Sequence, residues 1–260
     1  LRTTDDLPEV IYACEYDAAI SPNGNIPVHA FNLISPTFFA NSSTGNKYSL
    51  WVNVYGVSER YLNVYGEKDL RAQMNQFFHR TYTHPVDGTT LDMKMLCNWY
   101  WYDETAILET GKGTKDWNFY RYAETLLSAA ESIAQSQGVT AEAAGYLAQV
   151  KARANMEGKD VSTIASELQR LGKQAFIEEC WKERLREFPL EMKIWDDCVR
   201  TGKFPQISAT NKGEVQFVDL IGAKNGSGAT FKATDLYWPI PVNEIQRNPN
   251  LTQNEGYSAK

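Results

Sequence analysis

A sharp break between two helical patterns near residue 138 constrains the fold of this chain more than any other feature of its sequence. From about Trp117, apolar residues recur at spacings of three and four, which predicts a helix whose inward positions are Tyr120, Ala123, Leu126, Leu127, Ala130 and Ala134. Gly138 is expected to end this helix in a left-handed conformation. Thr140 then begins a second helix, with Leu147, Val150 and Ala154 on one stripe. Two helices with so short a connection must lie side by side and antiparallel.

The predicted hairpin begins with Asp116 as its N-cap and is similar in length to a tetratricopeptide unit, which has a period of about 34 residues. A single hairpin of this kind cannot bury its own apolar faces, so other parts of the protein must cover it. The sequence shows one such hairpin rather than an array.

Further helices are expected after the hairpin. A third helix is predicted from Val161 to Glu187, with an inward side made of Ile164, Leu168, Leu171, Ala175, Cys180 and Trp181. Its charged side is interpreted as a mostly solvated, partly self-paired face, formed by Glu178, Glu179, Lys182, Glu183, Arg184, Arg186 and Glu187. Pro189 should end or kink this helix, and a shorter one is predicted from Leu190 to Arg200.

The first hundred residues or so have a different texture. Turn clusters at 21–25 and 41–46 alternate with short β-prone pieces at 10–13 and 51–55. A single helix is predicted at 58–78, and the aromatic run Leu96-Cys-Asn-Trp-Tyr-Trp-Tyr102 is read as a strand or an extended loop. The sequence therefore predicts a mainly α fold in two regions. Residues 1–112 are loop-rich and irregular with short strands and one helix, and residues 113–260 are helical with an irregular tail.

The tail itself, Leu236 to Tyr257, contains three prolines and four asparagines, so it can be neither a long helix nor a central strand. Apolar residues are nevertheless spread through it, and we expect them to pin the tail to a preformed surface. They are Leu236, Trp238, Ile240, Ile245, Leu251 and Tyr257.

Composition and motifs exclude several classes of function. The net charge is −6, so the chain lacks the basic balance of a nucleic-acid-binding protein. No metal or other cofactor is predicted, because the four cysteines (Cys14, Cys97, Cys180, Cys198) are far apart and His79 and His84 have no third ligand beside them. No catalytic residues are predicted. Charged residues that could suggest a glycosidase are interpreted as ion pairs that tie helices together: Arg121, Glu124, Glu131, Arg153, Glu183, Arg184 and Glu187.

Several motifs, in their order along the chain, resemble those of the SusD/RagB family. They are Glu9-Val-Ile-Tyr12, Asp69-Leu-Arg71, Arg121-Tyr-Ala-Glu-Thr-Leu-Leu127, Leu147 to Ala154, the set Glu183, Arg184, Glu187, Glu191, Trp195, Asp197 and Arg200, and the segment Pro239 to Tyr257. The chain departs from the family pattern at Ala148, at Pro189, at Met192, where the family usually has glycine, and at Ile194. These departures concern local packing more than function.

The resemblance implies a non-catalytic surface lipoprotein of the bacterial outer membrane that captures glycans for a TonB-dependent, SusC-like transporter. Members of the family are about twice as long, so this chain would correspond to the C-terminal half, with the N-terminal half as a partner. Two alternatives stay open. The same architecture serves peptide importers, and this half could dock the transporter while the other half binds ligand.

Aromatic residues are the candidates for glycan contact, because sugar C–H faces stack on aromatic rings. Trp99 and Trp101 are expected to share one face of a strand, with Tyr100 and Tyr102 on the other. A second group lies in the early loops, where the resemblance implies part of the ligand surface: His29, Phe38, Phe39, Asn46, Tyr48 and Trp51.

Overall fold

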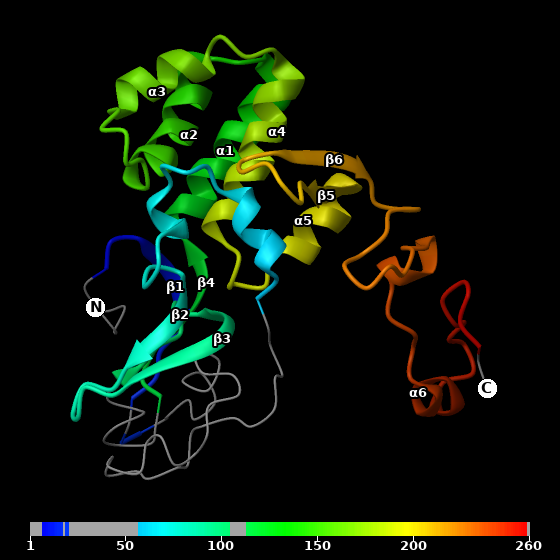
Figure 1. Cartoon of the computed structure of the whole chain (residues 1–260). Coiled ribbons are helices and arrows are strands. Elements are labelled where there is room, and N and C mark those ends of the chain that lie inside the picture. The colour runs from blue at the N-terminus through cyan, green and yellow to red at the C-terminus, as the bar shows by residue number, and fades with distance from the viewer. Residues whose placement is uncertain (1–6, 18, 21–56, 105–112, 259–260) are drawn as a thin grey trace. The chain divides into compact units, whose positions relative to one another are not determined.

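The computed structural model describes residues 7–17, 19–20, 57–104 and 113–258 of the 260-residue chain. These residues fall into two compact units (Figure 1). The first comprises 1–193 with 207–215, and the second comprises 194–206 with 216–260. The predicted boundary at 112/113 adjoins residues 105–112, which lie outside the described residues, and it stays a prediction.

Helices dominate the first unit, which confirms the mainly α prediction (Figure 1). Helix α1 (Tyr122–Gln137) and helix α2 (Ala141–Arg153) form the predicted hairpin, and α3 (Val161–Leu168) and α4 (Lys173–Glu187) pack against it. Gly138 ends α1 with a φ of 84°, and the Thr140 side chain accepts a hydrogen bond from the amide of Ala143. The core between the helices is made of Ala123, Leu126, Leu127, Ala130, Ala134, Ala143, Ala144, Leu147, Ala148, Val150, Ile164, Leu168, Phe176, Ile177, Cys180 and Phe188.

The first helix begins later than predicted. Residues Trp117–Arg121 form strand β4, which pairs antiparallel with β1 (Val10–Cys14), and Arg121 occupies the N-cap of α1. Asp116 therefore does not cap the helix. Its carboxylate instead accepts a hydrogen bond of 2.7 Å from the amide of Tyr16, which ties the end of β1 to the start of β4.

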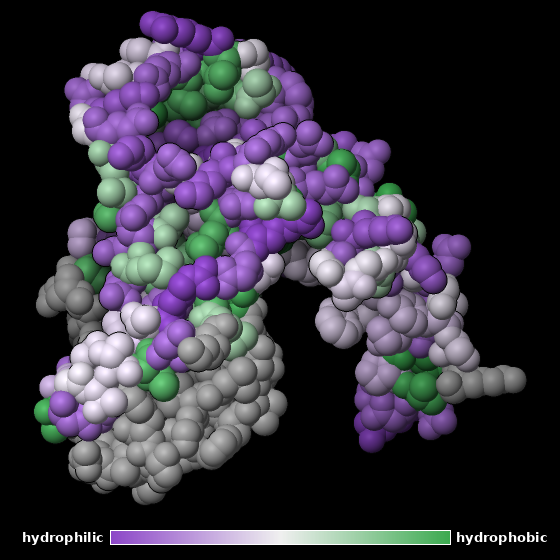
Figure 2. All heavy atoms as spheres, in the orientation of Figure 1, coloured by the Kyte–Doolittle hydropathy of each residue, from purple (hydrophilic) through white to green (hydrophobic). Residues whose placement is uncertain are grey.

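The predicted third helix is two helices. Asp160 is the N-cap of α3, and its side chain accepts a hydrogen bond from the amide of Thr163. Gly172 has an extended backbone and is the N-cap of α4. Because the intervening turn changes the phase of the helical pattern, Phe176 and Ile177 are buried in place of Ala175, which is exposed. The outer face of these helices is mostly hydrophilic (Figure 2).

The helix predicted at 58–78 is absent from the described structure of that segment. It contains two 3₁₀ turns, η3 (Glu59–Val64) and η4 (Leu70–Ala72), and then enters the hairpin of β2 (Phe78–Thr83) and β3 (Thr90–Asn98). Tyr65 adopts an extended conformation directly after η3 and ends the helical run. Its side chain is fully buried, and its hydroxyl donates to the carbonyl of Arg186 at 3.0 Å. Burial of the Tyr65 side chain against the rest of the protein thus outweighs the local preference for a continuous helix in this segment.

The second unit contains α5 (Ile194–Thr201), η6 (Ala233–Leu236) and α6 (Val242–Arg247). It also contains the two-stranded sheet of β5 (Lys203–Ile207) and β6 (Val215–Asp219), except for Ile207 and Val215, which belong to the first unit. The helix predicted from Leu190 starts only at Ile194 because Met192 has a left-handed φ of 58°, which a helix does not accommodate.

The tail of the second unit is held by its polar residues. Gln253 exchanges two hydrogen bonds with the backbone of Ile240, and the Asn254 amide donates to the carbonyl of Trp238. The single proton of the Tyr257 hydroxyl is shared between the backbone carbonyls of Tyr237 at 2.9 Å and Thr234 at 3.0 Å. Trp238 is 87% exposed, so its predicted role as an apolar anchor is wrong in this structure.

Candidate functional site

The predicted ligand-contact residues divide into two groups. Six of them fall outside the described residues: His29, Phe38, Phe39, Asn46, Tyr48 and Trp51. Trp99 and Trp101 are described, and both follow β3 in a turn that the amide of Tyr102 closes by donating to the carbonyl of Trp99 at 3.0 Å. Because β3 ends at Asn98, the predicted sharing of one strand face by these two tryptophans is wrong.

Trp101 is part of the core. Its side chain is 5% exposed, its ring stacks on that of Trp117 with 4.9 Å between centroids and 6° between planes, and its indole nitrogen donates to the carbonyl of Leu190 at 3.2 Å. A tryptophan with one face covered and its N–H partnered within the protein is packed as a structural residue. This arrangement favours the core interpretation of Trp101 over ligand contact.

Trp99 has a different environment. Its ring stacks on Tyr102 at 4.1 Å with 12° between planes and lies 4.8 Å from the ring of His79. It is only partly buried, and the Tyr102 hydroxyl donates to the carboxylate of Glu104 at 2.8 Å. Burial raises the pKa of Tyr102 well above its usual range, so this phenol stays neutral and can act as a hydrogen-bond donor. Trp99 therefore remains a candidate for ligand contact.

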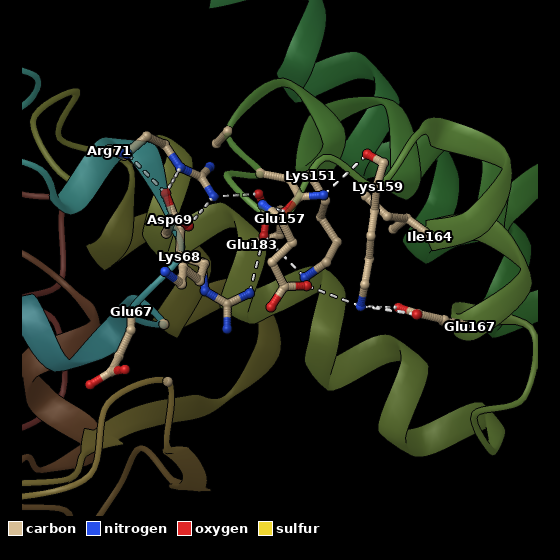
Figure 3. A pocket seen from close by; sticks show the side chains of 15 residues that line it. Glu67, Lys68, Asp69, Arg71, Lys151, Glu157, Lys159, Ile164, Glu167 and Glu183 are labelled. Atoms are coloured by element: carbon tan, nitrogen blue, oxygen red, sulfur yellow. Dashed lines mark hydrogen bonds and ion pairs between the residues drawn. The ribbon is translucent and has the colours of Figure 1, made fainter.

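A buried network of charges is the most highly organised polar feature of the described residues (Figure 3). Its centre is Glu183 on α4, which pairs with Arg71 at 2.9 Å, Arg186 at 3.1 Å and Lys151 at 3.6 Å. The Glu183 side chain is 1% exposed. Arg71 also pairs with Asp69 at 2.7 Å and with Glu187 at 2.9 Å. Two ion pairs therefore join η4 to α4, and the one to Glu187 is a charge-assisted hydrogen bond.

Arg121 forms a second centre of the same network. It lies at the junction of β4 and α1 and pairs with Glu9 at 2.8 Å, Glu187 at 3.0 Å and Glu191 at 2.7 Å. Arg153 from α2 also pairs with Glu187 and, at 3.3 Å, with Glu9. One arginine side chain thus links the β1–β4 ribbon, α1 and the end of α4.

The carboxylates of the network differ in their proton affinity. Burial acts to raise the pKa of Glu183, but the charges of Arg71, Lys151 and Arg186 outweigh it and hold that pKa well below its usual range. In Glu191 burial prevails over the attraction of Arg121, and its pKa is raised. Glu183 is therefore the more strongly held anion of the two.

A pocket of about 560 Å³ opens onto one side of the network (Figure 3). Its lining includes Lys68, Lys151, Asn155, Lys159 and Glu167 around the buried charges. Lys159 is paired with Glu157 at 3.1 Å and with Glu167 at 3.0 Å. The carboxylates of this pocket thus pair with lysine or arginine.

The described residues contain no group of three or more histidine, cysteine, aspartate or glutamate side chains placed to hold a metal ion. In the same part of the chain, no helix is both long and apolar enough to cross a membrane.

The network confirms the interpretation of these charges as ties between helices and corrects the prediction of a solvated face on α4. Glu183, Arg184, Arg186 and Glu187 are all buried, and Arg184 pairs with Glu124 at 3.2 Å. Sequence reasoning missed the participation of Glu9, Arg71 and Glu191. Each of these residues lies in a motif that resembles the SusD/RagB family. Their common occurrence in such motifs is the signal that could have assigned them to one network.

Comparison with known proteins places the chain among relatives of one kind. The sequence profile of the SusD family matches residues 40–257. The starch-binding protein SusD of Bacteroides thetaiotaomicron is 35% identical over 138 residues, which are 53% of this chain and 21% of that protein.

Solved structures share the fold. A SusD superfamily protein from Parabacteroides distasonis aligns with a TM-score of 0.78 and 27% identity over 98% of this chain and 51% of its own. The surface glycan-binding protein A of Bacteroides thetaiotaomicron, solved in complex with laminarihexaose, aligns with a TM-score of 0.60 and 18% identity over 95% of this chain and 52% of its own. The chain therefore spans about half the length of these structural relatives.

Proposed function

The chain belongs to the SusD family, and on that premise we propose that it takes part in the capture of oligosaccharides or polysaccharides at the bacterial cell surface. The glycan would be held without chemical change and delivered to a TonB-dependent, SusC-like transporter in the outer membrane. The observation that carries this proposal is the match to the SusD family over residues 40–257, together with 35% identity to a starch-binding relative.

A non-catalytic role agrees with the charge arrangement of the described residues. Glycoside hydrolysis needs two carboxyl groups on either side of a bond, about 5–10 Å apart in a cleft. The buried carboxylates here instead pair with arginines and lysines and join α2, α4, η4 and the β1–β4 ribbon. They are committed to holding the fold together.

The proposed ligand contacts are the loop aromatics His29, Phe38, Phe39, Tyr48 and Trp51 with Asn46, joined by Trp99. Flat rings stack on pyranose rings, and neighbouring amides bind the hydroxyls. The proposed partners are the transporter and an N-terminal half, to which the part of the structural relatives outside the alignment would correspond. The expected affinity is modest, roughly micromolar to millimolar.

Native electrophoresis through gels that contain single polysaccharides tests this proposal, with amylopectin, laminarin and xylan as the first panel. We expect at least one neutral polysaccharide to retard the protein and Trp51→Ala to weaken the retardation. Trp238→Ala is the matched control, because Trp238 is 87% exposed and its loss leaves the fold intact. Release by a peptide digest would favour the alternative of peptide capture, and equal retardation of both variants would contradict the proposed site.

A further inference from the structure

The β1–β4 ribbon exposes aromatic rings that the proposed site does not include. Tyr12 on β1 is 59% exposed, and Phe119 and Tyr120 on β4 are 43% and 56% exposed. The rings form a contiguous group. The centroid of Tyr12 lies 5.3 Å from that of Phe119 and 6.5 Å from that of Tyr120, with interplanar angles of 26° and 27°.

Irregular pairing of the two strands explains this grouping. Val10 pairs with Arg121, Tyr12 with Tyr120, and Ala13 with Asn118. Ile11 and Phe119 are thus extra residues, each inserted without a partner across the ribbon. Side chains of consecutive residues on a regular strand point to opposite faces. The bulge lets Phe119 and Tyr120, although adjacent in sequence, both contact Tyr12, and bulges commonly re-aim side chains near functional sites.

The polar group beside these rings is fixed. The Lys193 amine lies 4.9 Å from the centroid of the Tyr120 ring and donates to the backbone carbonyl of Phe119. Glu124 pairs with Lys193 at 2.6 Å and with Arg184 at 3.2 Å, and the Lys193 side chain is only 14% exposed. The rings are therefore held in place beside a carboxylate that two cations share.

We propose that Tyr12, Phe119 and Tyr120 form a further stacking surface for pyranose rings, made of residues that the proposed site does not include. This inference rests on the proposed function and adds a place of contact to it. The rings supply apolar faces of the size and polarity that sugar C–H faces require, and the phenol hydroxyls supply hydrogen bonds.

Isothermal titration of the full chain with maltohexaose and laminarihexaose, together with the affinity gels, tests this surface. The variants are Tyr12→Ala and Tyr120→Ala. We expect each to raise the dissociation constant for the oligosaccharide that the wild type binds by about two- to tenfold, the range for the loss of one aromatic stack. Tyr120→Phe keeps the ring and should stay within about twofold. Tyr237→Ala removes a tyrosine of the second unit that is 63% exposed, and it should leave the constant unchanged.

The outcomes separate the two proposals. If the wild type binds and the Tyr12 and Tyr120 variants bind equally well, the ribbon surface is wrong while the proposed function stands. If no neutral glycan of the panel retards the wild type, the proposed function fails and the ribbon surface fails with it. Circular dichroism identifies a variant that has lost its fold, and in that case Tyr12→Phe compared with Tyr12→Leu decides whether an aromatic ring is needed.

Discussion

Replacing Glu183 by glutamine should destabilise the first unit more than the same replacement at any exposed glutamate. The substitution preserves shape and removes one negative charge. Glu183 is fully buried and pairs with Arg71, Arg186 and Lys151 at 2.9–3.6 Å. After the change, the positive charges around it remain buried while their shared anion is gone. Removal of one partner from a buried ion pair costs about 3–5 kcal/mol.

This cost translates into a large thermal shift. For a domain of 150–250 residues, each 1 kcal/mol corresponds to about 2–4 °C in Tm, so Glu183→Gln should lower the Tm of the first unit by roughly 6–20 °C. The matched control is Glu59→Gln in the same unit, because the Glu59 side chain is 58% exposed and pairs with a half-exposed Arg80. An exposed pair of this kind contributes at most about 1 kcal/mol.

Thermal melts followed by circular dichroism at the helical signal provide the assay. Glu183→Gln should melt well below both the wild type and Glu59→Gln. If the two variants melted at the same temperature, the network would contribute no more than surface charges do, and the reasoning from its burial and geometry would be refuted.

Other changes test separate parts of the structure. Met192 is 73% exposed with a left-handed φ of 58°, so Met192→Gly should raise the free energy of unfolding by about 1 kcal/mol; a lower urea midpoint would contradict this. Trp101→Ala should lower it by about 3–5 kcal/mol, whereas a change below 1 kcal/mol would show that the indole is not core. The lowered pKa of Glu183 means that its stabilisation is complete above the ordinary glutamate pKa of about 4.3 and is lost as the pH falls toward the folded-state pKa. The wild type should therefore lose more Tm than Glu183→Gln between pH 5 and pH 2 (about the range over which such carboxylates titrate), and parallel losses would refute this. A Cβ at Gly256 would lie 2.1 Å from the Thr234 side chain, at a φ of 85°, so Gly256→Ala should increase proteolysis of the tail relative to Gly226→Ala, and equal cleavage rates would contradict the structure.

Local signals predicted the hairpin well. Gly138 and Thr140 are strong stop and start signals that act within a few residues, and both have the expected role in the structure. The β-prone piece at Val10 is likewise a strand. Strand β4 could not be predicted from local sequence, because its partner β1 lies more than a hundred residues away. The spacing of apolar residues before Arg121 fits a helix and gives no sign of that pairing.

The charged face of α4 shows a different limit of sequence reasoning. Acidic and basic residues at helical spacings look the same whether they face water or one another. Only the positions of Arg71 on η4 and Arg121 at the end of β4 show that Glu183 and Glu187 are buried anions. At Met192, by contrast, the sequence itself shows that the position is unusual, and the structure gives the reason. Its departure from the family's glycine is visible in the sequence, and the left-handed backbone gives the physical reason for that glycine.

The candidate site could be predicted only in part. The sequence identified the aromatic residues at 99–102 as candidates for ligand contact but not their orientation. Because the chain turns after Asn98, Trp101 packs in the core against Trp117, and Trp99 stacks on Tyr102. The exposed rings of the ribbon were not foreseen, because their grouping depends on two bulges that no local pattern reveals.

The most direct test of the central claim is calorimetric titration of the wild-type chain with neutral oligosaccharides, maltohexaose and laminarihexaose first, at up to millimolar concentration. Glycan capture predicts saturable binding of at least one oligosaccharide, with a dissociation constant roughly between micromolar and millimolar and with weaker binding by Trp51→Ala. No saturable binding of any neutral glycan by the folded chain would contradict the account.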